Sequence, residues 1–169
     1  MSTAAQSPVG LYTPEQRARR DNTRWTFVQG LLAPLQFLAF AVSLALVIRT
    51  LLTGDGATAA AISVVVKTGF LFTIMVTGAI WEKHVFGQYL FARAFFWEDV
   101  FSMLVIALHV AYLVALFTGI VDLQGQLFIA LAAYAAYVIN AGQFILKLRA
   151  ARLEERHALQ GASTAGNPA

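Results

Sequence analysis

The chain has 169 residues, of which 59% are hydrophobic and 12% are charged, and it contains no cysteine. This composition is far more apolar than that of an ordinary soluble domain, and the lack of cysteine excludes disulfides and thiolate chemistry. The formal net charge of +3 requires no nucleic-acid partner, because the positions of the cations fit a membrane topology.

The first segment, residues 1–24, is a polar arm without an apolar stretch, so we expect no cleaved signal peptide. Within it, Thr13 is a suitable N-cap and Pro14 a suitable first helical residue, which predicts a short surface helix. A membrane domain is expected over residues 25–153. The polar composition of residues 154–169 predicts a disordered tail.

The membrane domain contains four apolar runs, each long enough to cross a hydrocarbon core of ~30 Å as a helix. They lie at about 27–52, 58–81, 99–121 and 125–148. The connections "TGDGAT" and "DLQGQ" are short, and short connections make sequence neighbours pack antiparallel. The predicted fold class is therefore all-α, with four transmembrane helices in an antiparallel bundle.

Lysine and arginine predict the orientation of this bundle. In a four-span protein the arm, the 82–98 connector and the tail share one side of the membrane. These three segments carry Arg17, Arg19, Arg20, Arg24, Lys83, Arg93, Lys147, Arg149, Arg152 and Arg156. The positive-inside rule then places both termini and the connector in the cytoplasm.

Polar residues recur inside the first and second spans. In the first span the series Gln29, Gln36, Ser43 and Thr50 is spaced by seven residues, which predicts one polar line facing a neighbouring helix. Such a line either joins helices through hydrogen bonds or belongs to a functional site. In the second span, Lys67 is expected to lie toward the outer leaflet and to snorkel to its surface.

The third span carries the most informative polar pattern. Glu98, Ser102, Val105, His109 and Tyr112 fall on one helical face. Asp99 is rotated about 100° from Glu98 and is expected to point elsewhere. With Asn140 and Gln143 of the fourth span, these groups predict a polar cup that opens to the cytoplasmic side.

The connector 82–98 separates the second and third spans and combines charges with many aromatic rings. We expect an amphipathic segment that lies along the cytoplasmic interface. Its rings fit either an interfacial aromatic belt or a stacking surface for a large, flat ligand. The rings are Phe86, Tyr89, Phe91, Phe95, Phe96 and Trp97.

Four motifs resemble the 2-vinyl bacteriochlorophyllide hydratase family. They are "LAPLQF" (32–37), "VKT" (66–68), "TIMVTGAIWEKHVFGQYLFARAFFWEDVFSMLV" (73–105) and "AAYAAYVINAGQFILKLRAARLE" (132–154). The resemblance implies an integral enzyme of bacteriochlorophyll synthesis in a bacterial inner membrane, either cytoplasmic or intracytoplasmic. It would add water to the 3-vinyl group of chlorophyllide a or 3-vinyl bacteriochlorophyllide a, giving a 3-(1-hydroxyethyl) pigment. A related subgroup acts on chlorosome-pigment precursors, so the preferred chlorin stays open.

The resemblance also implies what the protein binds. The partners would be the chlorophyllide-type substrate, membrane lipid and other enzymes of the pathway. Magnesium would enter only as part of the chlorin, and no redox cofactor or nucleotide is needed. Stacking residues would be Phe95, Phe96 and Trp97, with Lys83 or Arg93 meeting the propionate. Gln36 and Asn140 are the other candidate substrate contacts.

Hydration of a vinyl group requires a proton donor for its terminal carbon and a base for water. A carboxylic acid in apolar surroundings keeps its proton more readily than one in water. Glu98 is the first candidate acid, because aromatic residues flank it, and Glu82 and Asp99 are the others. His84 or His109 could act as the base or bind the magnesium of the substrate.

Two other functions compete with the hydratase interpretation. A non-catalytic pigment carrier or assembly factor would use the same rings, with His109 as a magnesium ligand. A transporter subunit would use Lys67 and His109 as a proton path. The transporter is disfavoured, because the polar groups cluster in one half of the bilayer rather than crossing it.

Overall fold

The computed structural model describes residues 11–165, and within this range the chain forms five helices and no strand. The helices are α1 (Pro14–Asn22), α2 (Arg24–Thr53), α3 (Ala57–Phe86), α4 (Phe96–Thr118) and α5 (Leu123–Ala165). Helices α2 to α5 are each long and apolar enough to cross a membrane. The all-α class and the four predicted spans are therefore confirmed.

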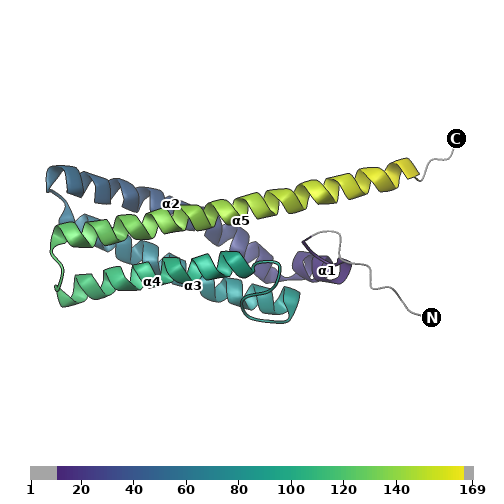
Figure 1. Cartoon of the computed structure of the whole chain (residues 1–169), viewed down its shortest axis with the longest axis horizontal. Coiled ribbons are helices and arrows are strands. Elements are labelled where there is room, and N and C mark those ends of the chain that lie inside the picture. The colour runs from purple at the N-terminus through teal and green to yellow at the C-terminus, as the bar shows by residue number, and fades with distance from the viewer. Residues whose placement is uncertain (1–10, 166–169) are drawn as a thin grey trace.

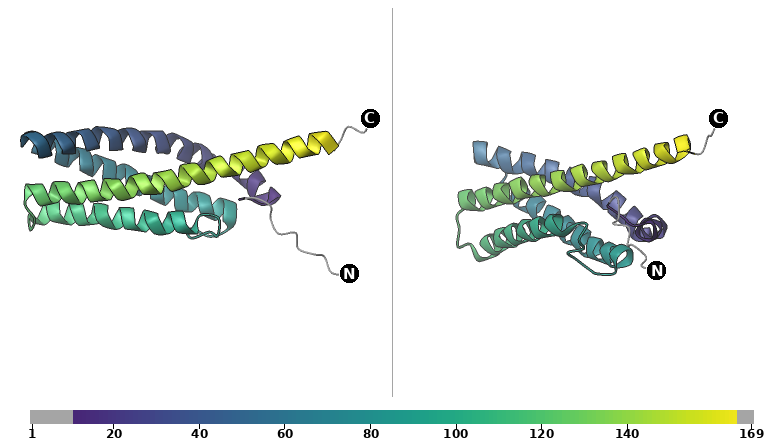
Figure 2. Two further views of the ribbon diagram at one scale, coloured as in Figure 1. Left: turned by 45° about the horizontal axis from the view of Figure 1, so that its top comes forward. Right: turned by 45° about the vertical axis from the view of Figure 1, so that its right-hand side comes forward.

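The four long helices run back and forth along one axis (Figures 1 and 2). The short α2–α3 and α4–α5 turns lie at one end, whereas α1 and the α3–α4 connector lie at the other (Figure 1). Helix α2 packs mainly on α3, and α4 mainly on α5. The bundle therefore consists of two helical hairpins, and α5 extends beyond its neighbours toward the C-terminus.

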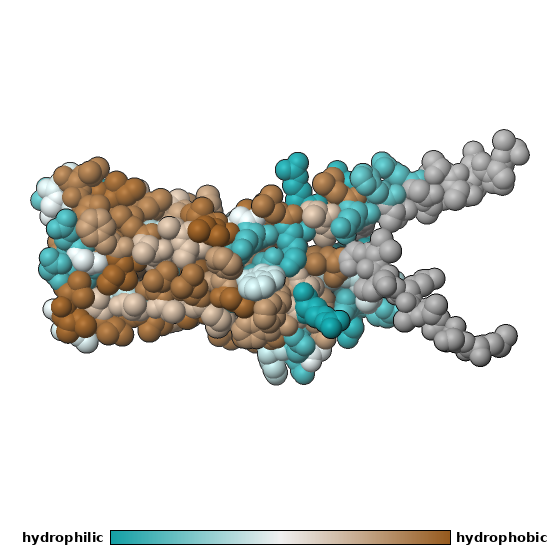
Figure 3. All heavy atoms as spheres, in the orientation of Figure 1, coloured by the Kyte–Doolittle hydropathy of each residue, from teal (hydrophilic) through white to brown (hydrophobic). Residues whose placement is uncertain are grey.

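The outer surface of the bundle is apolar along most of its length. Hydrophobic residues cover the long middle part, and hydrophilic residues gather at both ends (Figure 3). Large exposed side chains such as Phe37, Val76 and Phe117 are 60%, 62% and 76% exposed. A continuous apolar belt of this kind is expected of a surface in contact with lipid. The chain is therefore a multi-pass membrane protein.

The helix boundaries differ from the predicted spans in ways that matter for function. Helix α3 continues to Phe86 and α4 begins at Phe96, so the charged ends of the 82–98 segment belong to helices. Only the stretch between those two residues is non-helical. Helix α5 reaches Ala165, so residues 154–165 are helical where composition predicted disorder. Residues 166–169 lie outside the described range.

The arm is attached to the bundle through a local cap and an aromatic cluster. The hydroxyl of Thr13 accepts from the Gln16 amide, and the Gln16 side chain accepts from the Thr13 amide, which caps α1 as predicted. The ring of Tyr12 is buried and stacks on Phe86 at 5.8 Å between ring centroids. The arm thereby packs against the end of α3, beside the connector.

Candidate active site

The last turn of α3 and the first turn of α4 bring two carboxyl groups together. Glu82 and Asp99 are only 5% and 3% exposed, and their carboxyl groups lie within hydrogen-bonding reach of each other. The sequence predicted that Asp99 points away from the face of Glu98. Asp99 does point away from that face, but it is buried against Glu82. Its position around the helix did not predict this pairing.

The connector sits directly on this pair. The amide of Phe91 donates to Asp99 Oδ2 at 2.7 Å, and the amide of Ala92 donates to Glu82 Oε2 at 3.3 Å. Phe91 has a φ of 60°, a conformation that a bulky residue adopts only when its surroundings hold it there. The two acids therefore bind consecutive amides of the connector and fix its path.

Glu98 has a different partner. Its Oε2 lies 2.6 Å from Nζ of Lys147 on α5, and the Glu98 side chain is almost fully buried. The ammonium of Lys147 also lies 5.3 Å from the centroid of the Phe95 ring. The sequence suggested a proton donor among aromatic residues, but in the structure the ammonium of Lys147 is in contact with this carboxyl group. Glu98 is therefore better suited to an ion pair than to proton donation.

A second polar pair lies deep in the bundle. Lys67 on α3 and His109 on α4 are both 0% exposed, and Nζ of Lys67 is 2.7 Å from Nε2 of His109. Nδ1 of His109 lies 2.7 Å from the carbonyl of Val105. A proton on Nδ1 can be donated to that carbonyl, which leaves Nε2 to accept from Lys67. The Lys67 ammonium also lies 4.3 Å from the centre of the Tyr137 ring.

This position of Lys67 corrects a sequence-based prediction. The side chain does not snorkel to the outer surface, because it lies on the same inward face of α3 as Ala60, Val64 and Leu71. The spacing of those residues could have shown that Lys67 faces the bundle. Its partner could not be read from the sequence, because any of three neighbouring helices could have supplied it.

Two residues of the predicted polar line of α2, Gln29 and Ser43, join helices through hydrogen bonds. Gln29 donates to Thr77 on α3 at 2.7 Å. Farther along, the hydroxyl of Ser43 is bonded to Ser63 on α3 and to Tyr134 on α5. The α4 residues from Glu98 to Tyr112 that were predicted to share one face are buried together, and Ser102 among them accepts from Asn140 on α5 at 2.8 Å.

These groups are buried and do not line an open cup. Gln36, Ser102, His109 and Asn140 are all between 0% and 8% exposed. A cup open to water would leave such residues accessible, so this expectation is corrected. The physical reason is that the two hairpins close on each other, with Ser43 bonded to Tyr134 and Lys67 to His109 between them.

The aromatic residues of the connector divide into two groups. Phe95 is 2% exposed and packs among Tyr12, Val85 and Phe144, so it belongs to the core and is not a free stacking surface. Phe96 and Trp97, in contrast, are 43% and 65% exposed. Together with Phe91, whose ring centroid is 5.8 Å from that of Phe96, they form what we call the aromatic ledge (Phe91, Phe96 and Trp97).

The remaining candidates lie on the surface around the connector. Arg93 is exposed, as are Lys83 and His84. The ammonium of Lys83 donates to the Gly87 carbonyl at 2.7 Å, and Nδ1 of His84 lies 2.9 Å from the Ile80 carbonyl. Lys83 and His84 therefore bond to carbonyl groups at the end of their own helix, α3. Neither has a described hydrogen bond to the acid pair.

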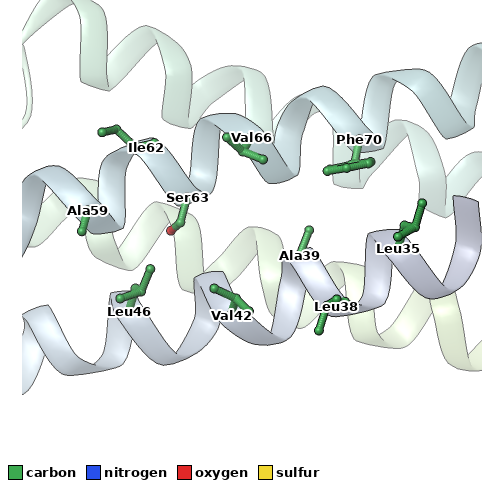
Figure 4. A pocket seen from close by; sticks show the side chains of 10 residues that line it. All are labelled: Leu35, Leu38, Ala39, Val42, Leu46, Ala59, Ile62, Ser63, Val66 and Phe70. Carbon is green, nitrogen blue, oxygen red and sulfur yellow. The ribbon is translucent and has the colours of Figure 1, made fainter.

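A groove of about 540 Å³ opens between α2 and α3, away from the acid pair. Figure 4 shows side chains from these two helices around it, and Ser63 is the only one that carries an oxygen. The groove contains no ionisable group, so it offers no acid or base. The acid pair is therefore a better candidate site than the groove, because proton transfer requires titratable groups.

The fold and the site define a class: a four-span helical membrane protein with paired carboxyl groups beside exposed aromatic residues at one end of the bundle. The part of the chain that the structure describes holds no group of three or more His, Cys, Asp or Glu that could bind a metal. Residues 12–150 match the family described as 2-vinyl bacteriochlorophyllide hydratase. The chain belongs to this family.

Two relatives carry the same description. A protein of Rhodobacter capsulatus is 69% identical over 156 residues, which cover 91% of each chain. A protein of Cereibacter sphaeroides is 72% identical over 145 residues, which cover 85% of this chain and 89% of the relative. Each is named 2-vinyl bacteriochlorophyllide hydratase. No solved structure matches the chain.

Proposed function

We propose that this protein is a hydro-lyase that adds water to the vinyl group of a chlorophyllide-type pigment in bacteriochlorophyll synthesis. The names of the two highly identical relatives support this activity. The structural observation that carries the proposal is the Glu82–Asp99 pair beside the aromatic ledge. It combines a proton donor with a surface suited to a flat, apolar macrocycle.

The pigment would bind to the aromatic ledge. Its three exposed rings offer apolar faces, and aromatic contacts add about 0.5–1.5 kcal/mol beyond buried area. Arg93 is exposed in the same connector and can bind a propionate through two parallel N–H donors. Phe91 and Ala92 cover the two carboxyl groups, so the pigment has to displace this part of the connector to reach them.

The acid pair would supply the proton. In this proposal the two carboxyl groups hold one proton between them. This proton bonds to the terminal CH2 of the vinyl group, and positive charge develops at the adjacent carbon, where the macrocycle delocalises it. The oxygen of water attacks that carbon, and a proton of the added water returns to the pair. No electron is transferred, so the step needs no redox cofactor.

The same proposal includes a location. The protein would lie in the bacterial inner membrane with both termini in the cytoplasm, because the cation-rich arm, connector and α5 end lie together (Figure 1). Lipid would contact the exposed apolar belt. Enzymes that supply and consume the pigment are expected as neighbours in that membrane.

The test is to incubate membranes from a host that expresses the protein with chlorophyllide a. Product heavier by one water supports hydration, whereas bound but unchanged pigment would indicate a carrier. Asp99→Asn should abolish most turnover and keep pigment binding. Asp122→Asn is the matched control, because the Asp122 carboxylate accepts from the Gly125 amide at the opposite end of the bundle. Equal loss in both variants would contradict the assignment.

A further inference from the structure

Three residues of α2 and α5 carry buried amide atoms that have no hydrogen-bond partner among the described residues. Gln36 on α2 is 2% exposed, and neither its amide nitrogen nor its amide oxygen has a hydrogen-bond partner among the described residues. On α5, Asn140 is 8% exposed, and its Oδ1 is also unpaired, as is the buried Oε1 of Gln143. Buried polar groups in native proteins are rarely left unpaired.

Helix register brings these amides to one level. The rings of Phe40 and Tyr137 meet at 5.0 Å between centroids, which aligns α2 with α5. Gln36 lies one turn before Phe40, and Asn140 lies one turn after Tyr137. Because α2 and α5 run in opposite directions (Figure 1), both amides lie one turn from this contact toward the connector end. Gln143 follows one turn farther.

The unpaired atoms specify the chemistry of what binds them. Two carbonyl oxygens, on Asn140 and Gln143, need a donor, whereas Gln36 offers both a donor and an acceptor. A bare cation would leave the Gln36 NH2 group unpaired, and an anion would face the carbonyl oxygens. Water both donates and accepts, and buried water typically makes two to four hydrogen bonds to such groups.

The site lies on a polar route from the surface. On α5, Asn140 and Gln143 are followed by Lys147, which is paired with Glu98. On α4, Ser102 holds Asn140 from one turn below Glu98. Glu98 is the sequence neighbour of Asp99 in the acid pair. Water bound at the three amides therefore lies between the deep Lys67–His109 pair and the proposed proton donor.

We propose that Gln36, Asn140 and Gln143 bind ordered water inside the bundle, and that this water is the co-substrate of hydration. The second half rests on the proposed function, because only a hydration reaction consumes the water. The three residues act by binding and positioning it. The proton transfers remain with the acid pair.

X-ray footprinting in H2(18)O tests the binding without any pigment, because hydroxyl radicals formed from bound water label adjacent side chains. Tyr137 is the reporter, next to the site on α5. We expect 18O label on Tyr137 in the wild type and a several-fold loss in Gln36→Leu and Asn140→Leu. Gln29→Leu is the matched control, because that amide is bonded to Thr77 and its loss should leave the label unchanged.

Steady-state hydration then tests the role of the water. In Gln36→Leu we expect kcat to fall at unchanged KM, because pigment docks elsewhere. An unlabelled Tyr137 in the wild type, or label that persists in both variants of the site, overturns the water site. Label that is lost with normal kcat overturns its role as co-substrate. If Tyr137 is labelled in the wild type but the wild type does not hydrate pigment, the water site stands and the proposed function is refuted.

Discussion

Nζ of Lys67 lies 2.7 Å from Nε2 of His109, in the interior of a membrane bundle where neither residue has exposed surface. No carboxylate is hydrogen-bonded to this pair among the described residues. Instead, Nζ of Lys67 contacts the lone pair on Nε2 of His109 and lies over the faces of two tyrosine rings. The pair therefore joins α3 to α4 by a bond that depends on both side chains.

Removing either partner of the Lys67–His109 pair should destabilise the bundle unequally. Lys67→Met leaves an unpaired ring nitrogen, which costs about 1–3 kcal/mol. His109→Leu should cost more, because it leaves a buried ammonium without its acceptor. Thermal unfolding in detergent measures both, and the double variant should recover part of the loss. A double variant as unstable as the sum of the singles would show that the two residues do not interact.

The acid pair should behave as one unit in catalysis. Glu82→Gln and Asp99→Asn should each lower the hydration rate by about 10²–10⁴-fold, the usual contribution of general acid–base catalysis. The double variant should be little slower than either single variant, since residues that act together are not additive. Rates are compared in membranes at matched protein levels. Losses that multiply would indicate two independent roles.

Glu98 provides the sharpest comparison with the acid pair. Its ion pair with Lys147 leads us to expect that Glu98→Gln costs stability and lowers hydration by less than about 10²-fold. Lys147→Gln should have a similar effect, because it removes the other half of the same contact. A loss in Glu98→Gln that exceeds the loss in Asp99→Asn would restore Glu98 as the proton donor.

Substitutions of the buried and the exposed connector rings should have different effects on folding stability and on pigment binding. Phe95→Ala removes a buried ring and should cost about 3–5 kcal/mol of folding stability. Trp97→Ala removes an exposed ring and should leave the melting temperature nearly unchanged while weakening pigment binding. Binding is followed by absorbance or fluorescence of the pigment in membranes. Unchanged binding in Trp97→Ala would make the aromatic ledge a membrane belt.

The orientation of the bundle can be checked with reporter fusions. A reporter fused after Arg156, near the end of α5, should be active only as a cytoplasmic marker, because the cations gather at that end. A reporter inserted after Asp122, in the turn between α4 and α5, should behave as periplasmic. The reverse pair of results would place the acid pair on the other side of the membrane.

The sequence by itself determined the number of spans, their order and the residues that face inward on α4. Hydrophobic length is a local property, and a repeat of three to four residues places Glu98, Ser102 and His109 on one face whatever surrounds the helix. The seven-residue series of α2 indicated an interhelical line for the same reason. The family resemblance, confirmed over residues 12–150, added the chemistry.

Only the tertiary structure decided which polar groups meet. Lys67 and His109 are 42 residues apart in the chain, and Glu98 and Lys147 are 49 apart. In a helix that is apolar on nearly every side, composition does not determine the rotation of that helix against its neighbours. Packing of the two hairpins set those rotations. It turned Lys67 inward, placed Asp99 against Glu82, and buried Gln36 with its amide unpaired among the described residues.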